Sequence, residues 1–595
     1  MASLAASVAS GAPAVRQPGS TRRLLLWFRN DLRVHDNYTV SEAARLIKSR
    51  QFAEVLPVYV FDPRNFIITP FGNPKTGGHR AQFLLESVAD LKQQLRKLGS
   101  DLAVTVGKPE HILPGLLMGC PSSLVLTMEE STSEEKTVDA AVVKALDPAG
   151  SRLQKVWGHT LYHLDDLQGN GGPFSSGGIK TMPNIFTPFK EQVERRCQVR
   201  ALAPTPGPGS LPLPDPAAPV AFPGNSCHSS SRGGVGAEGA GSVGQLLAWE
   251  ADWASLPWPD VFKPKAPPAK DPRAVLDYRG GETVALARLK YYLWESDLLA
   301  TYFDTRNGML GGDYSTKFSA WLAAGCLSPR QIYHEIKRYE QERTANKSTY
   351  WVVFELLWRD FFRFYAIKHG SRIFFETGPI GKSIPWSADP SLLQRWQEGR
   401  TGMPLVDANM REIAATGFMS NRGRQNVASY LVLDLGVDWR RGADWFESLL
   451  LDHDVTSNWG NWVAAAGLTG GRINAFNITK QSKDYDLMGE YLRTWLPELA
   501  KVPAPHIHEP WLMSKQDQDK YGVQIGVDYP APVPASQLAR PHSAYGASRG
   551  NGRPYSGRGS RDDNGPGRGG GVGRGAGGRG GRGQPTRRSE FERFG

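Results

Sequence analysis

Short apolar runs alternate with amphipathic segments over the first part of the chain. The runs LLLWF (24–28), VLPVYVF (55–61) and SLVLTM (123–128) have the length of β-strands and are mostly apolar. Such strands are typical of a parallel sheet that is covered by helices on both faces. Between them, residues 80–98 (RAQFLLESVADLKQQLRKL) have the spacing of an amphipathic helix. The pattern therefore predicts an α/β, Rossmann-like domain with a parallel sheet at residues 23–170.

The glycine-rich loop with which many Rossmann-like domains bind phosphate is missing after the first strand. A GxGxxG pattern occurs at residues 234–239, but it lies in SSSRGGVGAEGAGS with no strand before it. A phosphate loop needs a strand before it and a helix after it, so we interpret this match as linker composition. Residues 201–275 around it are rich in Pro, Gly and Ser. We therefore predict that residues 171–280 form an interdomain linker with a disordered insert.

Helices dense in aromatic residues indicate a second domain. The chain has 17 tryptophans, and indole rings either bury much apolar area or stack on a flat partner. Residues 350–370 (YWVVFELLWRDFFRFYAIKHG) are apolar nearly all round, as expected of a buried central helix. Glu355 and Arg359 are exceptions within it, and they need partners because an unpaired buried charge is costly. We expect an all-α domain at residues 281–500 and a less regular extension at 501–540.

The last segment, residues 541–595, repeats RG and RGG and cannot form a core. It contains eleven arginines and four acidic residues, so it supplies +7 of the formal net charge of +11. Arginine-rich segments bind RNA or single-stranded DNA through phosphate charge and base stacking. We therefore expect a disordered nucleic-acid-binding tail, and a disordered extension that only improves solubility is the alternative.

Residues 1–22 are rich in Ala and Ser and contain no acidic residue. This composition predicts a transit peptide for the chloroplast, with the mitochondrion or a plain disordered N-terminus as alternatives. No apolar run approaches the roughly 18 residues of a membrane span. The four cysteines are scattered and form no CxxC pair, so neither a disulfide framework nor a metal site is expected.

Four longer motifs lie along the two predicted domains: WFRNDLRVHDN (27–37), GGDYSTKFSAWLAAGCLSPRQ (311–331), ELLWRDFFRF (355–364) and DHDVTSNWGNWVAAAG (452–467). Taken in this order, they resemble the photolyase/cryptochrome family. The stretches NGMLGGDYSTKFSAW and NWGNW resemble its DASH branch. The resemblance extends over residues 24–490 and is interrupted by the linker. It implies an N-terminal domain that holds an antenna chromophore and a helical domain that encloses a folded FAD.

The resemblance also implies which residues bind the FAD diphosphate, namely Ser315, Thr316, Lys317 and Ser319. Hydroxyl and backbone N–H groups at a turn into a helix suit such an anion. An ordinary capped helix start would use the same residue types, so these residues alone do not identify the ligand.

Other positions match the family's pocket for the flavin ring. Arg424 and Asp452 resemble the ion pair that flanks the isoalloxazine, and Asn458 matches the residue that faces flavin N5. A neutral amide there can hydrogen-bond N5 without adding negative charge, so it should tune which reduced flavin state is stable. The remaining positions implied for this pocket are Arg359, Asn421, Asp434 and Asp454. Asp454 alone could equally be the N-cap of a core helix.

Three tryptophans, Trp462, Trp439 and Trp386, fall where the family has an electron-hopping chain from flavin to surface. Indole is the most readily oxidised neutral side chain, so spaced indoles can reduce a photoexcited flavin in steps. Core packing is the alternative explanation for each tryptophan taken singly.

The resemblance implies that Glu355, Trp358, Asn421 and Gln425 contact a pyrimidine dimer. A protonated Glu355 could hydrogen-bond the pyrimidine carbonyl and stabilise the developing charge. The sequence departs from the pattern at Ala464, where photolyases have a second stacking aromatic and DASH proteins usually have Tyr. One base–aromatic stack is worth roughly 1–3 kcal/mol, and flipping a base from a duplex costs a few kcal/mol. We therefore predict repair in single-stranded or looped DNA rather than in duplexes.

Glu130, in TMEESTSEE, matches a family glutamate that binds the pterin of the antenna methenyltetrahydrofolate. An acidic residue after a strand is also an ordinary helix-start residue, which is the alternative.

Three functions remain after these observations. The first is deoxyribodipyrimidine photolyase activity on single-stranded DNA, by a protein expected to be monomeric and not membrane-bound. The second is a blue-light photoreceptor that signals by flavin photoreduction without repair. The third is an RNA- or single-strand-binding protein that acts through its tail.

Overall fold

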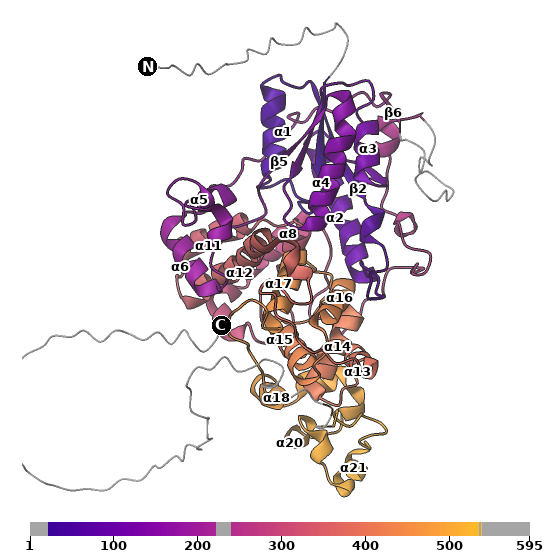
Figure 1. Cartoon of the computed structure of the whole chain (residues 1–595), viewed down its shortest axis with the longest axis vertical. Helices are drawn as coiled ribbons and strands as arrows, with labels where there is room; N and C mark the ends of the chain where they lie inside the picture. The colour runs from indigo at the N-terminus through magenta and orange to yellow at the C-terminus, as the bar shows by residue number, and fades with distance from the viewer. Residues whose placement is uncertain (1–21, 222–239, 535–536, 538–595) are drawn as a thin grey trace, which may run out of the picture. The chain divides into compact units, whose positions relative to one another are not determined.

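A five-stranded parallel sheet forms the first part of the protein, whose computed structural model describes residues 22–221, 240–534 and 537 (Figure 1). The strand order is β3-β2-β1-β4-β5. The strands are β1 (Arg23–Phe28), β2 (Glu54–Phe61), β3 (Ala103–Val106), β4 (Leu124–Met128) and β5 (Arg152–Val156). Leu24 lies beside Val55 of β2 and Leu124 of β4, so β1 is the central strand. The predicted α/β, Rossmann-like domain is confirmed.

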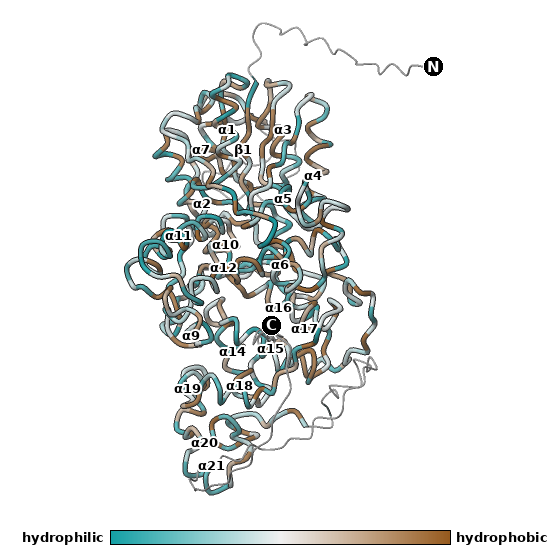
Figure 2. The backbone as a smooth tube through the Cα atoms, turned by 90° about the vertical axis from the view of Figure 1, so that its left-hand side faces the viewer, coloured by the Kyte–Doolittle hydropathy of each residue, from teal (hydrophilic) through white to brown (hydrophobic). Residues whose placement is uncertain are grey.

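The sheet has an apolar core on each face. Leu24 and Leu26 of β1 belong to one buried cluster, whereas Leu25 and Trp27 belong to another. Successive side chains of a strand point to opposite faces, so a strand that is covered on both sides needs apolar residues at every position. Figure 2 shows the apolar stretches around β1. The covering helices are α1 (Tyr38–Lys48), α2 (Gly78–Lys97), α3 (Pro109–Gly115) and α4 (Ser133–Leu146), and α5 (Leu164–Gln168) follows the last strand.

The second part of the protein is helical and is centred on α12 (Lys347–His369), as the sequence predicts. Asn346 caps α12 by accepting hydrogen bonds from the backbone N–H groups of Ser348 and Thr349. The other helices are α8 (Glu282–Lys290), α9 (Tyr302–Thr305), α10 (Ser319–Ala323), α11 (Pro329–Glu342), α13 (Pro390–Gln397), α14 (Pro404–Thr416), α15 (Asn421–Ser429), α16 (Trp439–Leu449), α17 (Val455–Ala465), α18 (Ile478–Tyr485), α19 (Glu490–Trp495), α20 (Ala504–Ile507) and α21 (Lys515–Tyr521). Helices α9 and α17 both pack on α12.

The region between the two parts in sequence, residues 171–280, contains secondary structure of its own. Helix α6 (Phe186–Arg196) packs on α12 through the buried rings of Phe186 and Phe189. Strands β6 (Pro219–Ala221) and β7 (Ala240–Ser242) form an antiparallel pair, and α7 (Val243–Leu247) follows them. The insert predicted to be disordered overlaps residues 222–239, which lie outside the described residues.

The motif at residues 27–37 joins the sheet to the helical domain. The backbone N–H groups of Val34 and His35 donate to the carboxylate of Glu282 at 2.8 and 2.9 Å. Asp36 forms an ion pair with Arg330 at 2.9 Å, and both side chains are buried. The two domains therefore belong to one compact unit, and the helices that carry the site have fixed positions relative to the sheet.

The predicted transit peptide (1–22, of which only Arg22 is described) and the RGG tail (541–595) lie outside the described residues. Among the helices that the structure describes, none is long and apolar enough to cross a membrane.

Candidate functional site

The loop before α10 carries the residues implied for the FAD diphosphate. Lys317 has a φ of +61°, so the chain turns sharply there before Ser319 begins the helix. Arg288 of α8 holds the loop, since its guanidinium donates hydrogen bonds to the backbone oxygens of Gly312, Ser315 and Thr316. Arg288 was not predicted from the sequence.

Phe418 brings the two predicted parts of the flavin pocket together. The amine of Lys317 lies 5.2 Å from the centre of the Phe418 ring, and the guanidinium carbon of Arg424 lies 5.6 Å from it. The centre of the Tyr278 ring lies 5.3 Å from the centre of the same Phe418 ring. Arg424 in turn donates to both carboxylate oxygens of Asp452, at 3.0 and 2.8 Å. The predicted Arg424–Asp452 ion pair and Lys317 therefore share one cluster.

This cluster is polar, buried and incompletely paired, which fits a large polar cofactor. The hydroxyl groups of Tyr278 and Tyr314 and one carboxylate oxygen of Glu412 have no hydrogen-bond partner among the described residues. The amine of Lys317 is buried and donates only to Ser315 Oγ, at 3.2 Å. Burial lowers the pKa of Lys317 well below its usual value and raises that of Glu412 to about 7. Because unpaired buried polar groups are costly, we expect FAD to bind to these groups.

Helix α17 begins beside this cluster. Asp454 caps the helix by accepting a hydrogen bond from Ser457 N. This agrees with the alternative interpretation of Asp454 as the N-cap of a core helix. Its carboxylate also forms a buried ion pair with Arg363 of α12 at 2.6 Å. The side-chain amide of Asn458 donates to the carbonyl of Ala443 at 2.9 Å, so its own carbonyl oxygen is held in a set direction.

Of the three predicted tryptophans, only Trp386 is partly exposed. Trp462 and Trp439 are buried. Trp462 lies against α16, because a Cβ on Gly442 would come within 2.3 Å of its indole, and Gly442 is one turn from Trp439. The backbone N–H of Ser387 donates to Gly436 O at 2.7 Å, which holds the Trp386 segment beside the loop before Trp439.

Two elements carry the residues implied for the substrate. Asn421 and Gln425 are exposed and lie one turn apart on α15. Glu355 of α12 forms an ion pair with Arg306 at 3.1 Å. Burial raises the pKa of Glu355, and the charge of Arg306 partly opposes this.

Arg422 connects these two elements. Its guanidinium donates to Asn307 Oδ1 at 3.0 Å and to Gln425 Oε1 at 2.9 Å. Asn307 directly follows Arg306, the ion-pair partner of Glu355. Arg306 and Arg422 were not predicted as site residues, although both lie in sequence next to residues of the recognised motifs.

Trp358 is partly exposed one turn after Glu355, and its indole stacks on Phe186 of α6. Ala464, near the end of α17, is also partly exposed and offers no aromatic ring to a base.

The resemblance also implies Arg359 and Asp434 for the flavin pocket. The guanidinium of Arg359 donates to the backbone oxygens of His159 and Leu322, so it ties α12 to the sheet domain. Asp434 ends the π-helical turn Tyr430–Asp434, and burial raises its pKa to about 6. Neither Arg359 nor Asp434 forms an ion pair with Arg424 or Asp452 in the part of the chain that the structure describes.

Glu130 lies two residues after the end of β4 and close to Arg363 of α12, in the helical domain. Its carboxylate accepts a hydrogen bond from Asn30 at 2.9 Å and lies 3.6 Å from Arg363. Burial by itself would raise the pKa of Glu130, but His159, Arg29 and Arg363 together lower it to about 2. Because burial lowers the pKa of His159, the two arginines are the permanent positive charges near Glu130.

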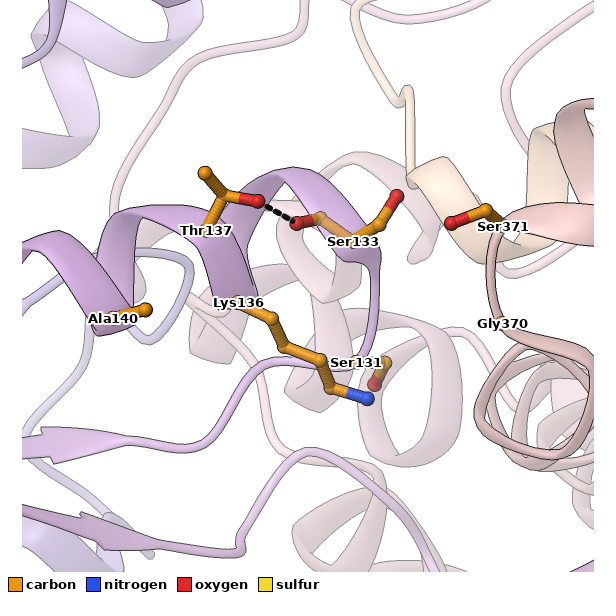
Figure 3. A pocket seen from close by; sticks show the side chains of 7 residues that line it. All are labelled: Ser131, Ser133, Lys136, Thr137, Ala140, Gly370 and Ser371. Carbon is orange, nitrogen blue, oxygen red and sulfur yellow. Dashed lines mark hydrogen bonds between the residues drawn. The ribbon is translucent and has the colours of Figure 1, made fainter.

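A cavity of about 410 Å³ opens directly after Glu130, between α4 and the turn Gly370–Phe374. Ser133 and Ser371 face each other across it, and the amine of Lys136 points toward Ser131 (Figure 3). The carboxylate of Glu130 does not line this cavity.

Comparisons with known proteins agree with this geometry. Residues 24–209 match the family described as DNA photolyase, and residues 351–544 match the FAD binding domain of DNA photolyase. The cryptochrome DASH of Ostreococcus tauri, named chloroplastic/mitochondrial, is 50% identical over 517 residues, which are 85% of this chain and 89% of that protein. The cryptochrome DASH of Arabidopsis thaliana is 42% identical over 498 residues, 83% of this chain and 79% of that protein.

A solved structure of a cryptochrome from Synechocystis sp. has the same fold. It has a TM-score of 0.72 and 43% sequence identity, and the match covers 87% of this chain and 97% of that one. The ranges that the family models match contain the sheet, most of the helical domain, and Phe418, Arg424 and Asp452 of the polar cluster. The chain therefore belongs to the photolyase/cryptochrome family, and within it to the cryptochrome DASH group.

Proposed function

We propose that this protein transfers an electron, under blue light, to cyclobutane pyrimidine dimers in single-stranded or looped DNA. The observation that supports this most directly is a set of exposed or partly exposed substrate-type side chains. Glu355 and Trp358 lie on α12, and Asn421 and Gln425 lie on α15, the helix that also carries Arg424 of the flavin cluster. A lesion bound there would lie next to the residues that fit FAD.

Each residue has a defined task in this proposal. Bound FAD, when reduced and excited by blue light, supplies the electron that reverses the dimer. Glu355, whose pKa is raised by burial, donates a hydrogen bond to a pyrimidine carbonyl when it is protonated. The neutral amide of Asn458 holds the flavin side of the pocket without adding charge. Trp462, Trp439 and Trp386 carry electrons inward from the surface.

Dimer reversal should be at least about tenfold more efficient on single-stranded than on double-stranded oligomers. The duplex substrate adds a flipping cost of a few kcal/mol, and Ala464 removes a stack worth roughly 1–3 kcal/mol that would offset it. The measurement is kcat/KM for light-driven reversal on matched oligomers. A chain truncated after residue 540 separates the contribution of the tail from that of the pocket. Equal efficiency on both substrates would refute the proposal.

The second candidate function is a blue-light photoreceptor that works without repair. Ala464 favours it, because a pocket with one stacking ring holds a flipped lesion less firmly than a pocket with two. The same assay separates the two functions, since a receptor would photoreduce its flavin normally and leave dimers intact on both kinds of DNA.

We also propose that Glu130 binds the pterin of the antenna methenyltetrahydrofolate, and that the neighbouring cavity, which the Glu130 carboxylate does not line, holds the folate tail. Lys136 offers a cation for the carboxylates of the folate tail, and Glu130 offers an ionised acceptor for pterin N–H groups. Replacing Glu130 with Gln should weaken folate binding about tenfold or more, because hydrogen bonds to charged groups are worth roughly 1.5–3 kcal/mol.

The readout for Glu130→Gln is the near-UV absorption that survives bleaching of the flavin. Glu134→Gln is the matched control, since Glu134 is a largely exposed acid on the same segment that pairs with Lys75. Retention of that absorption in Glu130→Gln would contradict the assignment.

The proposed partners are single-stranded DNA at the pocket and single-stranded nucleic acid, including RNA, at the RGG tail. The proposed oligomeric state is a monomer. The composition of residues 1–22 and the names of the relatives from Ostreococcus tauri and Arabidopsis thaliana favour an organelle, and we propose the chloroplast before the mitochondrion.

A further inference from the structure

Phe186 stacks face to face on Trp358, the aromatic side chain that we assign to the substrate pocket. The ring centres are 3.7 Å apart and the ring planes differ by 8°, a closer and more parallel contact than any other that Trp358 makes. Phe362 of α12 is the other stacked neighbour, at 5.7 Å and 28°. Trp358 nevertheless stays partly exposed. The stacked rings of Phe186 and Phe362 therefore hold the plane of the indole, and its exposed part has a set direction.

Phe186 is part of the core and not a movable lid. Its side chain is 5% exposed and makes edge contacts with Phe354 and Phe361, at 5.2 and 5.7 Å. The segment before it is anchored to the end of α12, because Lys368 and His369 both contact the side-chain oxygen of Asn184, at 2.6 and 3.0 Å. A base that binds here cannot displace Phe186 without breaking these contacts.

The start of α6 also lies next to the segment that follows α17. Ile185 is 51% exposed, and a Cβ on Gly471 would come within 3.9 Å of its side chain. Phe362, the other ring that borders Trp358, packs on Gly460 of α17, where a Cβ would come within 2.4 Å of its ring. The packed rings of Phe186, Trp358 and Phe362 therefore connect α6 to α17, the helix that carries Asn458 and Ala464.

We propose that Phe186 is a positioning residue that fixes the plane of Trp358 for stacking on an unpaired pyrimidine. This inference rests on the proposed function of the same pocket. Because Ala464 supplies no second ring, correct placement of the one remaining indole carries more of the base stacking. Phe186, which lies in the region between the two domains in sequence, thereby supports the substrate pocket.

The test compares Phe186→Leu with Phe189→Leu in the full-length, FAD-loaded protein. Phe189 lies one turn further along α6 and is equally buried, but its ring contacts are with Phe174, Phe361 and Phe364 and not with Trp358. The Kd is measured for a single-stranded oligothymidylate with one dimer and for the undamaged oligomer. The rate of dimer reversal at saturating substrate, the FAD content and the midpoint of thermal unfolding are measured alongside.

We expect Phe186→Leu to weaken binding of the dimer-containing oligomer about tenfold, the size of one lost base stack. The reversal rate at saturation and the FAD content should stay near those of the wild type. Phe189→Leu should bind the dimer like the wild type even if it lowers the unfolding midpoint as much. Phe186→Tyr, which keeps the ring, should restore most of the affinity.

Other outcomes overturn the inference in distinguishable ways. If the wild type binds and repairs the dimer and Phe186→Leu does the same with unchanged Kd, the positioning role is wrong while the proposed function stands. Equal loss of affinity in both variants would show that α6 acts only through general packing. If the wild type shows no preference for the dimer, the proposed function fails, and the inference fails with it.

Discussion

Replacing Trp462 with Phe should slow light-driven reduction of the bound flavin by at least about tenfold. The benzene ring of Phe is much harder to oxidise than indole, so the first electron transfer to the flavin becomes less favourable. Each 59 mV added to the one-electron potential of the donor side chain lowers the equilibrium constant of that transfer tenfold. Trp462 is buried and lies against α16 one turn from Trp439. Phe fills most of the same volume, so the fold and the FAD content should change little. The measurement is the rate of loss of oxidised-flavin absorption under blue light with an external reductant.

Trp495→Phe provides the matched control for this experiment. Trp495 of α19 is 1% exposed, in the same domain, and makes no ring contact with the three chain tryptophans. Full-speed photoreduction in Trp462→Phe would remove the electron-transfer role and leave core packing as the explanation. A similar slowing in Trp495→Phe would indicate a general effect of losing an indole.

Replacing Arg363 with Met should destabilise the fold by roughly 3–5 kcal/mol at pH 7, the usual cost of leaving a buried charge without its partner. Arg363 pairs with Asp454 at 2.6 Å, and their side chains are 6% and 9% exposed. It also lies 3.6 Å from Glu130, so its loss leaves two buried carboxylates without this cation. The free energy of unfolding is obtained from urea titration, with FAD content measured in parallel.

The effect should depend on pH in a defined direction. Arg363 and Arg359 hold the pKa of Asp454 far below its usual value despite its burial. A depressed pKa in the folded state contributes stability that is present above the unfolded pKa of about 4 and is lost as the pH falls. The difference between wild type and Arg363→Met should therefore shrink below about pH 4.

A second variant tests whether the uncompensated charge is the cause. Adding Asp454→Asn to Arg363→Met removes one of the two stranded carboxylates, so it should recover part of the lost stability. If Arg363→Met lowered the free energy of unfolding by less than about 1 kcal/mol, the prediction would be wrong. The Arg363–Asp454 ion pair would then contribute no more than an exposed surface ion pair does.

Much of the fold could be predicted because its signals are local. An apolar residue at every position of LLLWF indicated a strand covered on both faces, and β1 indeed contributes to two separate cores. The apolar run at residues 350–370 indicated a central helix, and α12 is that helix. The same locality applies within the site, since Asn458 and Trp462, or Asn421 and Gln425, share a helix face through the helical repeat.

Contacts between distant residues could not be obtained in this way. Lys317, Phe418 and Tyr278 meet across 140 residues of sequence, and no pattern in any one segment encodes that meeting. Arg288, which holds the loop before α10, lies in a helix with no recognised motif. The helix that contains Phe186 was also missed, because the whole of residues 171–280 was assigned to a linker on the composition of residues 201–275.

The sequence by itself determined the class of each domain, several of its strands, the central helix and, through its motifs, the family. These follow from hydrophobic periods and capping residues that act over a few residues. Only the tertiary structure decided which side chains share the polar cluster at Phe418, which cation neutralises Asp454, and which ring supports Trp358. Those pairings depend on how α6, α8, α12 and α17 pack, and packing is decided by the shapes of whole surfaces rather than by any local stretch.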